Sequence, residues 1–228
     1  MTDKVLIKKV LIANRGEIAV RIIRACAETG IRSVAIYTEP DRYALHVKRA
    51  DEAYSLGEDP LAGYLDPQCI VNLALETGCD AIHPGYGFLS ENAEFARLCE
   101  QQGIAFIGPK SSVIHNMGDK TQARDSMRAA GVPITPGSEG NLADVEEALK
   151  LADEIGYPIM VKATSGGGGR GIRRCDTPQE LKLQYPRVIS EATKAFGSAE
   201  VFMEKCIVNP RHIEVQILAD SQGNVIHL

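Results

Sequence analysis

The sequence predicts an α/β fold with two domains, a doubly wound parallel sheet in residues 1–135 and a small α+β domain in residues 136–228. In the first hundred residues, short apolar runs alternate with amphipathic helical stretches, which is the pattern of a parallel sheet with helices on both faces. A segment rich in proline and glycine follows at residues 132–141. After it the order becomes strand, glycine run, strand, helix and two strands, which is typical of an antiparallel sheet.

Parallel strands in the first domain are expected at four apolar runs, residues 10–13, 33–37, 80–83 and 104–108. Helices are expected between them, because apolar residues recur there every three or four positions. Ser90 is expected to cap the helix that precedes the fourth strand. Glycine readily adopts the left-handed conformation that ends a helix, and three glycines are expected to do so: Gly30, Gly78 and Gly103.

A helix at residues 112–131, which carries Lys120, Arg124 and Arg128, is expected to lead towards the second domain. In that domain, Thr177 precedes a proline and lies three residues before a glutamate, the pattern of a capped helix start. The other predicted elements are a helix at 144–155 and strands at 157–163, 171–175, 199–207, 211–220 and 225–228. The last strand has no closing element after it, so we expect the chain to be a fragment of a longer protein.

The composition is that of an ordinary globular protein, with 44% hydrophobic and 24% charged residues. The net charge of −5 offers no general attraction to nucleic acid or to an anionic membrane, so we expect neither as a partner. The N-terminal MTDKVLIKK has charges where a signal peptide needs apolar residues, and no apolar run approaches the roughly 20 residues of a membrane span. These observations favour a cytoplasmic protein.

The six cysteines are expected to be reduced thiols, mostly buried, rather than metal ligands or disulfide partners. No two of them have the C-x-x-C spacing of a metal or redox site. They are Cys26, Cys69, Cys79, Cys99, Cys175 and Cys206.

The stretch VKATSGGGGRGIRR, residues 161–174, predicts a loop that binds phosphate. Four adjacent glycines are costly to order, but their backbone N–H groups can approach phosphate oxygens closely, and Lys162 and Arg170 add positive charge on either side. The run is not a Walker A loop, because no Gly-Lys-Ser/Thr closes it. A glycine-rich loop between two strands that folds over nucleotide phosphates is the closer analogue. The alternative is a flexible linker, but apolar strands flank the run directly.

Two further motifs follow predicted strands. ANRGEIA, residues 13–19, joins a strand to a helix N-terminus, a geometry that accepts anions, although a capped helix start explains it equally well. HPGYGFLSEN, residues 83–92, lies at the carboxyl edge of the sheet, where open α/β sheets bind ligands. Its two glycines would expose Tyr86, whereas His83 has the simpler interpretation of a hydrogen-bonded histidine at a strand end.

Taken together, IANRGEIAVRIIRA, HPGYGFLSEN, MGDK, GGGGRG and NPRHIEVQ, in this order and spacing, resemble biotin carboxylase. That domain belongs to the ATP-grasp superfamily and serves acetyl-CoA, propionyl-CoA and pyruvate carboxylases. The resemblance covers essentially the whole chain. It implies an N-terminal α/β domain and the small ATP-grasp lid domain, with the chain truncated before a C-terminal domain.

The resemblance also assigns roles to matching positions. Lys120 and Lys162 look like the two lysines that contact the nucleotide, and Tyr86 matches a tyrosine near the biotin pocket. Taken alone, Lys120 has the alternative of a solvated helix charge, and Glu204 with Lys205 that of an exposed strand-end pair. The remaining implied ATP contacts are Gly168 and Gly169 in the flap, the hinge Glu204, Lys205, Cys206 and Ile207, whose backbone reads the adenine edge, and His212 beside the ribose.

Two departures from the family pattern stand out. Many members have five glycines after Lys-Ala-Ser, whereas here Thr164 and Ser165 precede four, which is more similar to the pyruvate and propionyl-CoA branches. Arg174 stands where an apolar residue is usual. Neither departure involves the matching lysines.

In this family, ATP phosphorylates bicarbonate to carboxyphosphate, whose breakdown carboxylates biotin on a carrier protein. The resemblance therefore implies an ATP-dependent carbon–nitrogen ligase with ATP, Mg²⁺, bicarbonate and carrier-bound biotin. It also implies as partners a biotin carboxyl carrier protein or domain, a carboxyltransferase subunit and a second copy in a homodimer. The magnesium-binding glutamates, the bicarbonate-holding arginine and the catalytic lysine of the family are expected beyond Leu228. We therefore expect no catalytic residue and no metal ligand in this chain, and no turnover by the chain alone.

Two alternatives remain. Another ATP-grasp ligase would share the glycine flap, but it should lack ANRGEIA and HPGYGFLSEN together. A fragment of this kind could also serve only as a nucleotide-binding or interaction module without catalysis. An ATP titration compared with a partner pull-down would separate these two roles.

Overall fold

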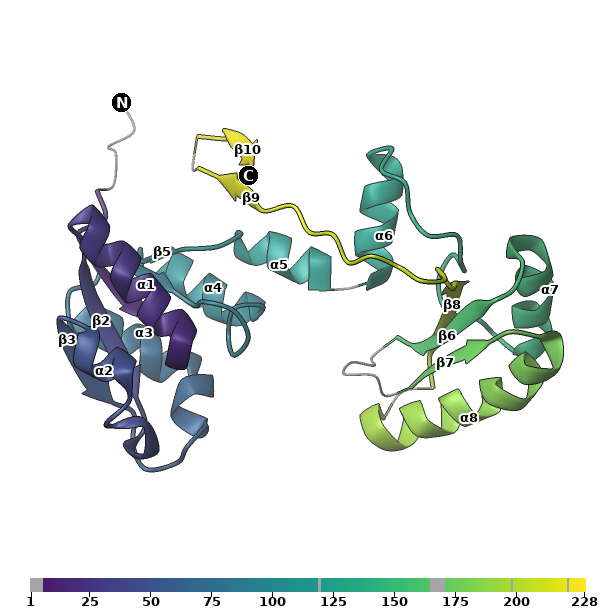
Figure 1. Cartoon of the computed structure of the whole chain (residues 1–228), viewed down its shortest axis with the longest axis horizontal. Helices are drawn as coiled ribbons and strands as arrows, with labels where there is room; N and C mark the ends of the chain where they lie inside the picture. Colours follow the sequence, from purple (N-terminus) through teal and green to yellow (C-terminus); the bar gives the residue numbers. More distant parts are fainter. Residues whose placement is uncertain (1–5, 119, 165–170, 198, 221) are drawn as a thin grey trace. The chain divides into compact units, whose positions relative to one another are not determined.

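The structure is a computed structural model that describes residues 6–118, 120–164, 171–197, 199–220 and 222–228, with the backbone alone at residues 120, 121 and 196. The chain forms two compact units, Met1–Ala123 and Arg124–Leu228 (Figure 1). The domain boundary predicted at residues 135 and 136 falls within the second unit and stays a prediction.

The first unit contains a five-stranded parallel sheet in the order β3-β2-β1-β4-β5. The strands are β1 (Lys9–Ile12), β2 (Arg32–Tyr37), β3 (Glu52–Ser55), β4 (Ala81–His83) and β5 (Ala105–Phe106). The parallel α/β class and the four predicted strands are confirmed. The fifth strand, β3, was not predicted, because its sequence EAYS has no apolar run and it lies at the edge of the sheet, half-buried or exposed.

The helices of the first unit follow the predicted alternation with three corrections. Asn92, not Ser90, caps the helix before β5, and its side-chain oxygen accepts the Phe95 N–H at 2.9 Å. The single helix expected at 112–131 is two helices, and a short helix after β2 was not predicted. The helices are α1 (Gly16–Thr29), α2 (Leu45–Arg49), α3 (Pro67–Glu76), α4 (Ala93–Gln101) and α5 (Ser111–Gly118), with 3₁₀ turns at Glu39–Asp41 and Ala62–Leu65. The boundary between the units falls within α6 (Lys120–Ala129).

Both faces of the parallel sheet are buried, which explains why its strands are continuous apolar runs. Val10 and Ile12 lie on one face and pack with α1 residues such as Ile22. Leu11, between them in β1, lies on the other face with Ile70 of α3 and Phe95 of α4. Helices on both faces leave only the two ends of the strands free for function.

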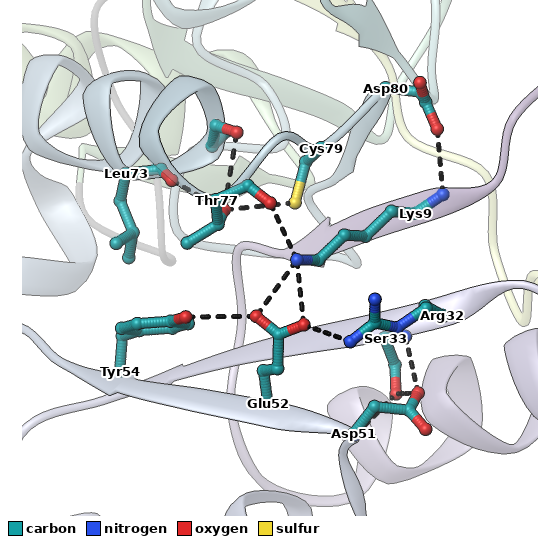
Figure 2. A network of polar contacts seen from close by, with 11 residues as sticks. Lys9, Arg32, Ser33, Asp51, Glu52, Tyr54, Leu73, Thr77, Cys79 and Asp80 are labelled. Atoms are coloured by element: carbon teal, nitrogen blue, oxygen red, sulfur yellow. Dashed lines mark hydrogen bonds and ion pairs between the residues drawn. The ribbon is translucent and has the colours of Figure 1, made fainter.

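The amino edge of this sheet is held by a network of charges (Figure 2). The Lys9 ammonium, at the start of β1, lies 2.8 Å from the Glu52 carboxylate of β3 and donates to the Thr77 carbonyl at 2.7 Å. The same carboxylate accepts hydrogen bonds from Arg32 and Tyr54. Because the Lys9 and Glu52 side chains are only 14% and 23% exposed, the Lys9–Glu52 pair is better shielded from water than an ordinary surface pair.

The second unit contains an antiparallel sheet in the order β7-β6-β8 and a separate hairpin of β9 and β10. The predicted strand at 211–220 is confined to the three residues that pair in this hairpin, and the sequence did not indicate two separate sheets. The elements are α7 (Val145–Ile155), β6 (Ile159–Ala163), β7 (Ile172–Cys175), α8 (Pro178–Phe196), β8 (Val201–Lys205), β9 (Ile217–Ala219) and β10 (Val225–His227). Thr177 caps α8 as predicted, accepting the Glu180 N–H at 3.2 Å.

One face of the β7-β6-β8 sheet is covered by α7 and α8 (Figure 1). Alternate residues of the strands point into this core: Ile159 and Val161 of β6, and Val201 and Met203 of β8. The residues between them therefore point to the opposite face. That face carries the polar groups described below.

Four of the six cysteines, Cys26, Cys79, Cys99 and Cys175, are buried as expected, whereas Cys69 is exposed and Cys206 is half-buried. Burial raises the pKa of the Cys99 thiol to about 12 and that of Cys175 to about 11, so both stay protonated and unreactive near neutral pH. Within the described ranges, no helix has both the length and the apolar character needed to cross a membrane.

Candidate functional site

The open face of the β7-β6-β8 sheet brings together two of the predicted site residues, Lys162 and Glu204. In the antiparallel register Lys162 lies opposite Phe202 and Glu204 opposite Met160, so the two are diagonal neighbours on one face. Side chains at such positions reach each other when they are long. The Lys162 ammonium bonds to the Glu204 carboxylate, and the side chains are 26% and 20% exposed.

Arg124, on α6, is the second cation at Glu204. Its Nη1 lies 3.5 Å from Glu204 Oε2, while its Nη2 donates a hydrogen bond of 2.8 Å to the Thr135 carbonyl. The Arg124 side chain is only 19% exposed. The sequence predicts a helix around Arg124 but gives no sign of this contact, because 80 residues separate Arg124 from Glu204.

The Lys205 side chain lies on the opposite face of the sheet from Glu204. Its ammonium donates to the carbonyls of Gly156 and Tyr157, at 3.0 and 2.8 Å, and so closes the turn between α7 and β6. The alternative of Glu204 and Lys205 as an exposed strand-end pair is therefore wrong. Their side chains are partly buried and have different partners.

Some backbone N–H groups of the predicted hinge already donate hydrogen bonds within the protein. The Lys205 N–H donates to the Pro136 carbonyl at 2.7 Å, and the Cys206 N–H donates to the Pro158 carbonyl at 3.0 Å. In the described part of the chain, the N–H of Ile207 has no hydrogen-bond partner. The Ile207 N–H is thus the first hinge donor that a ligand can use.

The glycine run starts and ends at residues fixed by the sheet. The Ala163 N–H donates to the Gly171 carbonyl at 2.8 Å, and the Thr164 N–H donates to the Glu200 carbonyl at 3.0 Å. Gly171 has a φ of +66°, and a Cβ there would lie 2.9 Å from the Cβ of Ala163. Gly168 and Gly169 lie outside the described residues, as does the side chain of Lys120, which begins α6.

His212 is not part of the Lys162–Glu204 cluster in this structure. It lies between β8 and β9, where its Nε2 is 3.1 Å from the Glu214 carboxylate. Both side chains are more than 80% exposed.

In the first unit, the two motifs that follow strands meet at the carboxyl edge of the sheet. The chain leaves β1 towards α1 and β2 on one side and leaves β4 towards β5 on the other, so the switch point of the sheet lies between β1 and β4. The Asn14 side chain, 4% exposed, spans it and donates to the carbonyls of Pro84 and Tyr86 at 2.7 and 2.8 Å.

Tyr86 extends from this edge with its side chain 61% exposed, as the flanking glycines predicted, and its hydroxyl bonds to the Glu17 carboxylate. His83 has the simpler of its two interpretations, because its Nδ1 accepts the Gly85 N–H at 3.0 Å. Burial lowers the pKa of His83, which favours the neutral ring.

Arg15, also in the first motif, belongs to a cluster that the sequence did not indicate. Its guanidinium lies 2.8 Å from the Asp41 carboxylate and 5.6 and 5.8 Å from the centres of the stacked rings of Tyr64 and Phe88. Burial opposes ionisation of Asp41, but hydrogen bonds from Arg15 and Tyr64 outweigh it and lower its pKa. The cluster fixes the start of α1 beside the loop after β4.

Among the described residues, no group of three His, Cys, Asp or Glu side chains is placed to hold a metal ion. Lys162, a cation on the open sheet face shortly before the glycine run, is of a kind that suits a phosphate-bearing ligand.

Comparison with known proteins matches the chain to two families, which meet a few residues before the boundary between the two units. Residues 6–114 match the family described as biotin carboxylase, N-terminal domain, and residues 119–228 match the carbamoyl-phosphate synthase L chain, ATP binding domain. The chain is 59% identical over 223 residues to the 2-oxoglutarate carboxylase small subunit of Hydrogenobacter thermophilus, covering 98% of this chain and 47% of that protein. It is 56% identical over 226 residues to biotin carboxylase 1 of Bacillus subtilis, covering 98% and 50%.

The fold is also similar to that of a solved structure. The biotin carboxylase domain dimer of the H. thermophilus 2-oxoglutarate carboxylase, in complex with MgADP, ADP and bicarbonate, superimposes with a TM-score of 0.87 at 58% identity, covering 98% of this chain and 49% of that one. The chain thus spans about half the length of the curated relatives it matches.

Proposed function

The chain belongs to the biotin carboxylase family, and we propose that it forms the nucleotide-binding half of an enzyme that carboxylates carrier-bound biotin with ATP and bicarbonate, via carboxyphosphate. The observation that carries the proposal is the pairing of Lys162 with Glu204 on the open sheet face, next to the start of the glycine run. An ammonium in that position suits a nucleotide phosphate.

In this proposal, Lys162 exchanges partners when ATP binds. Its ammonium has three donors and turns from the Glu204 carboxylate towards a phosphate oxygen, while Gly168 and Gly169 cover the phosphates. Lys120 supplies the second positive charge. Covering the site keeps water away from carboxyphosphate, which hydrolyses readily.

The adenine ring is proposed to lie along the hinge from Glu204 to Ile207. Because the Lys205 and Cys206 N–H groups already donate within the fold, we assign the Ile207 N–H to the adenine edge. His212, which is exposed in this structure, is proposed to contact the ribose.

Tyr86 is proposed to lie near the biotin ring. Its hydroxyl is held by Glu17 and its backbone by Asn14, so its position is fixed from two sides. The carboxyl edge of the sheet is the place where a ligand of this fold class binds.

Mg²⁺ is proposed to be held, together with bicarbonate, by residues of the longer protein, because the described residues offer no ligand set. No step is assigned to the metal in this chain. The chain alone is proposed not to turn over, since it spans only about half of its relatives. Its proposed partners are a biotin carboxyl carrier protein or domain, a carboxyltransferase subunit and a second copy in a homodimer. Its proposed compartment is the cytoplasm, in keeping with its six unpaired thiols.

The first test is the thermal unfolding of the chain with and without MgATP. A ligand at about 100 times its dissociation constant stabilises the folded state by about 2.7 kcal/mol. We expect that stabilisation in the wild type, its loss in Lys162→Ala, and its retention in Lys150→Ala, which removes an exposed lysine of α7. Equal stabilisation of the two variants would contradict the role of Lys162.

Turnover is tested separately by the bicarbonate- and biotin-dependent release of ADP. We expect none above a protein-free blank. Release by the purified chain would overturn the proposal that it is inactive alone, without affecting the nucleotide site.

A further inference from the structure

We propose that Arg124 is a positioning residue of the nucleotide site, which releases Lys162 to the phosphates by holding the carboxylate of Glu204. The inference rests on the proposed role of Lys162 and adds a residue that neither the sequence motifs nor the relatives' descriptions assign. Arg124 is not proposed to contact the nucleotide.

The geometry gives each oxygen of Glu204 its own cation. Lys162 bonds to Oε1, and Arg124 Nη1 lies 3.5 Å from Oε2. The other Nη of Arg124 is fixed by the Thr135 carbonyl at 2.8 Å. A planar guanidinium presents several N–H donors in one plane, so it can hold both acceptors at once.

The consequence appears when Lys162 moves. The Glu204 side chain is 20% exposed, so a carboxylate that lost both of the cations paired with it among the described residues would be poorly solvated. With Arg124 present, Glu204 keeps one cation after Lys162 has turned to a phosphate. Arg124 thus lowers the cost of the exchange, and its separation from Glu204 leaves room to shorten to about 2.8 Å when it becomes the sole partner.

A purely structural role is the competing explanation, because Arg124 also ties α6 to residue Thr135. The two roles differ in their dependence on Glu204. If Arg124 acts through the carboxylate, its removal should matter only while the carboxylate is charged. If it acts through Thr135 or by direct contact with ATP, its removal should matter equally when Glu204 is neutral.

The experiment is a double-mutant cycle in MgATP affinity, measured by isothermal titration calorimetry with the whole 228-residue chain. The variants are Arg124→Ala, Glu204→Gln and the double variant. The matched control is Arg128→Ala, which removes the same charge from the next turn of α6, where Arg128 is 43% exposed and paired with Asp125 at 3.1 Å. Thermal unfolding without nucleotide verifies that each variant is folded.

We expect Arg124→Ala to weaken MgATP binding about tenfold, and less than about twofold when Glu204 is already Gln. Arg128→Ala should bind as the wild type does. Equal losses in the two backgrounds, or no loss at all, would overturn the inference. If Arg124→Ala does not fold, Arg124→Lys takes its place in the cycle, since one ammonium cannot reproduce the guanidinium bridge between Thr135 and Glu204. A wild-type chain that binds no MgATP would instead contradict the proposed function itself, and the inference would fall with it.

Discussion

The side-chain amide of Asn14 donates a hydrogen bond of 2.8 Å to the backbone carbonyl of Tyr86, 72 residues further along the chain. The same nitrogen donates to the Pro84 carbonyl at 2.7 Å. One buried side chain thereby joins the loop after β1 to the loop after β4, at the edge where parallel sheets bind ligands.

Asn14→Ala should destabilise the first unit by about 2 kcal/mol, because it leaves two carbonyls without their donor in a place that water hardly reaches. Urea denaturation measures the loss, and hydrogen exchange of the β1 and β4 amides localises it. Asn72→Ala, at an exposed position of α3, is the control and should change the free energy of unfolding by less than about 0.5 kcal/mol. Equal effects of the two substitutions would show that the Asn14 bonds contribute nothing.

Gly85 and Gly87 form a matched pair, with φ of +65° and +66°. A Cβ at Gly85 would lie 2.8 Å from the Asn14 amide nitrogen, whereas a Cβ at Gly87 would meet nothing within 4 Å. Gly87→Ala should therefore cost only the left-handed backbone strain, about 1–2 kcal/mol, and Gly85→Ala clearly more. Comparing their urea midpoints tests this. The double variant Gly85→Ala/Asn14→Ala should lose less free energy of unfolding than the two single variants together, because the clash between the new Cβ and the Asn14 amide disappears.

The stability of the first unit should fall as the pH decreases from about 7.5 to about 5.5. Burial lowers the pKa of His46, against smaller opposing effects of the Ile36 carbonyl and Asp41, and burial also lowers the pKa of His83. The unfolded state therefore binds more protons through this range, so stability rises with pH. Urea unfolding at intervals of pH should show a positive slope, at most about 1.4 kcal/mol per pH unit for each histidine. A flat profile would mean that the two rings are protonated as readily in the folded state as in the unfolded state.

Glu52 should govern a second, more acidic transition. The hydrogen bond from Lys9 lowers the pKa of Glu52, so its contribution is present above the pKa of an unfolded glutamate, about 4.3, and is lost as the pH falls through the folded value. Glu52→Gln should destabilise the chain at pH 7, and its difference from the wild type should shrink towards pH 3. Glu76→Gln, at an exposed position of α3, provides the comparison. If the unfolding free energies of Glu52→Gln and the wild type differ by the same amount at every pH, the effect of Glu52 comes from packing and not from its charge.

Lys205→Met should destabilise the second unit, because the carbonyls of Gly156 and Tyr157 lose their donor while the apolar stem is kept. The expected loss in the free energy of unfolding is about 1–3 kcal/mol. Lys182→Met, on the exposed side of α8, removes the same charge without such contacts and should have little effect. Thermal unfolding of both variants provides the comparison.

Much of the fold could be predicted because apolar periodicity and glycine stops are local. The strands β1, β2 and β4 are continuous apolar runs, and their burial on both faces explains that pattern. The edge strand β3 could not be predicted, because its residues Glu52 and Tyr54 are selected for the charge network and not for the core. Asn92 and Ser90 are both good caps, and only the backbone geometry distinguishes them.

The motifs pointed to single candidate residues but not to how these residues are arranged. The motifs singled out Lys162 and Glu204, yet their pairing depends on the register of β6 and β8, which a sequence does not specify. Lys205 follows Glu204 directly and belongs to the opposite face, so adjacency in the sequence was misleading. Arg124 has no motif of its own, and its role depends on a contact over 80 residues.

The alternation along β6 has a consequence for how this site can evolve. Val161 belongs to the core and Lys162 to the open face, so core and open-face positions alternate within one strand. Exchanging a side chain on the open face changes the chemistry of that face and leaves the core intact. Deleting or inserting one residue within the strand would instead turn Lys162 inward and a core residue outward, and both functions would fail together. The open face can therefore change through point substitutions, whereas changes of length are tolerated only in the loops.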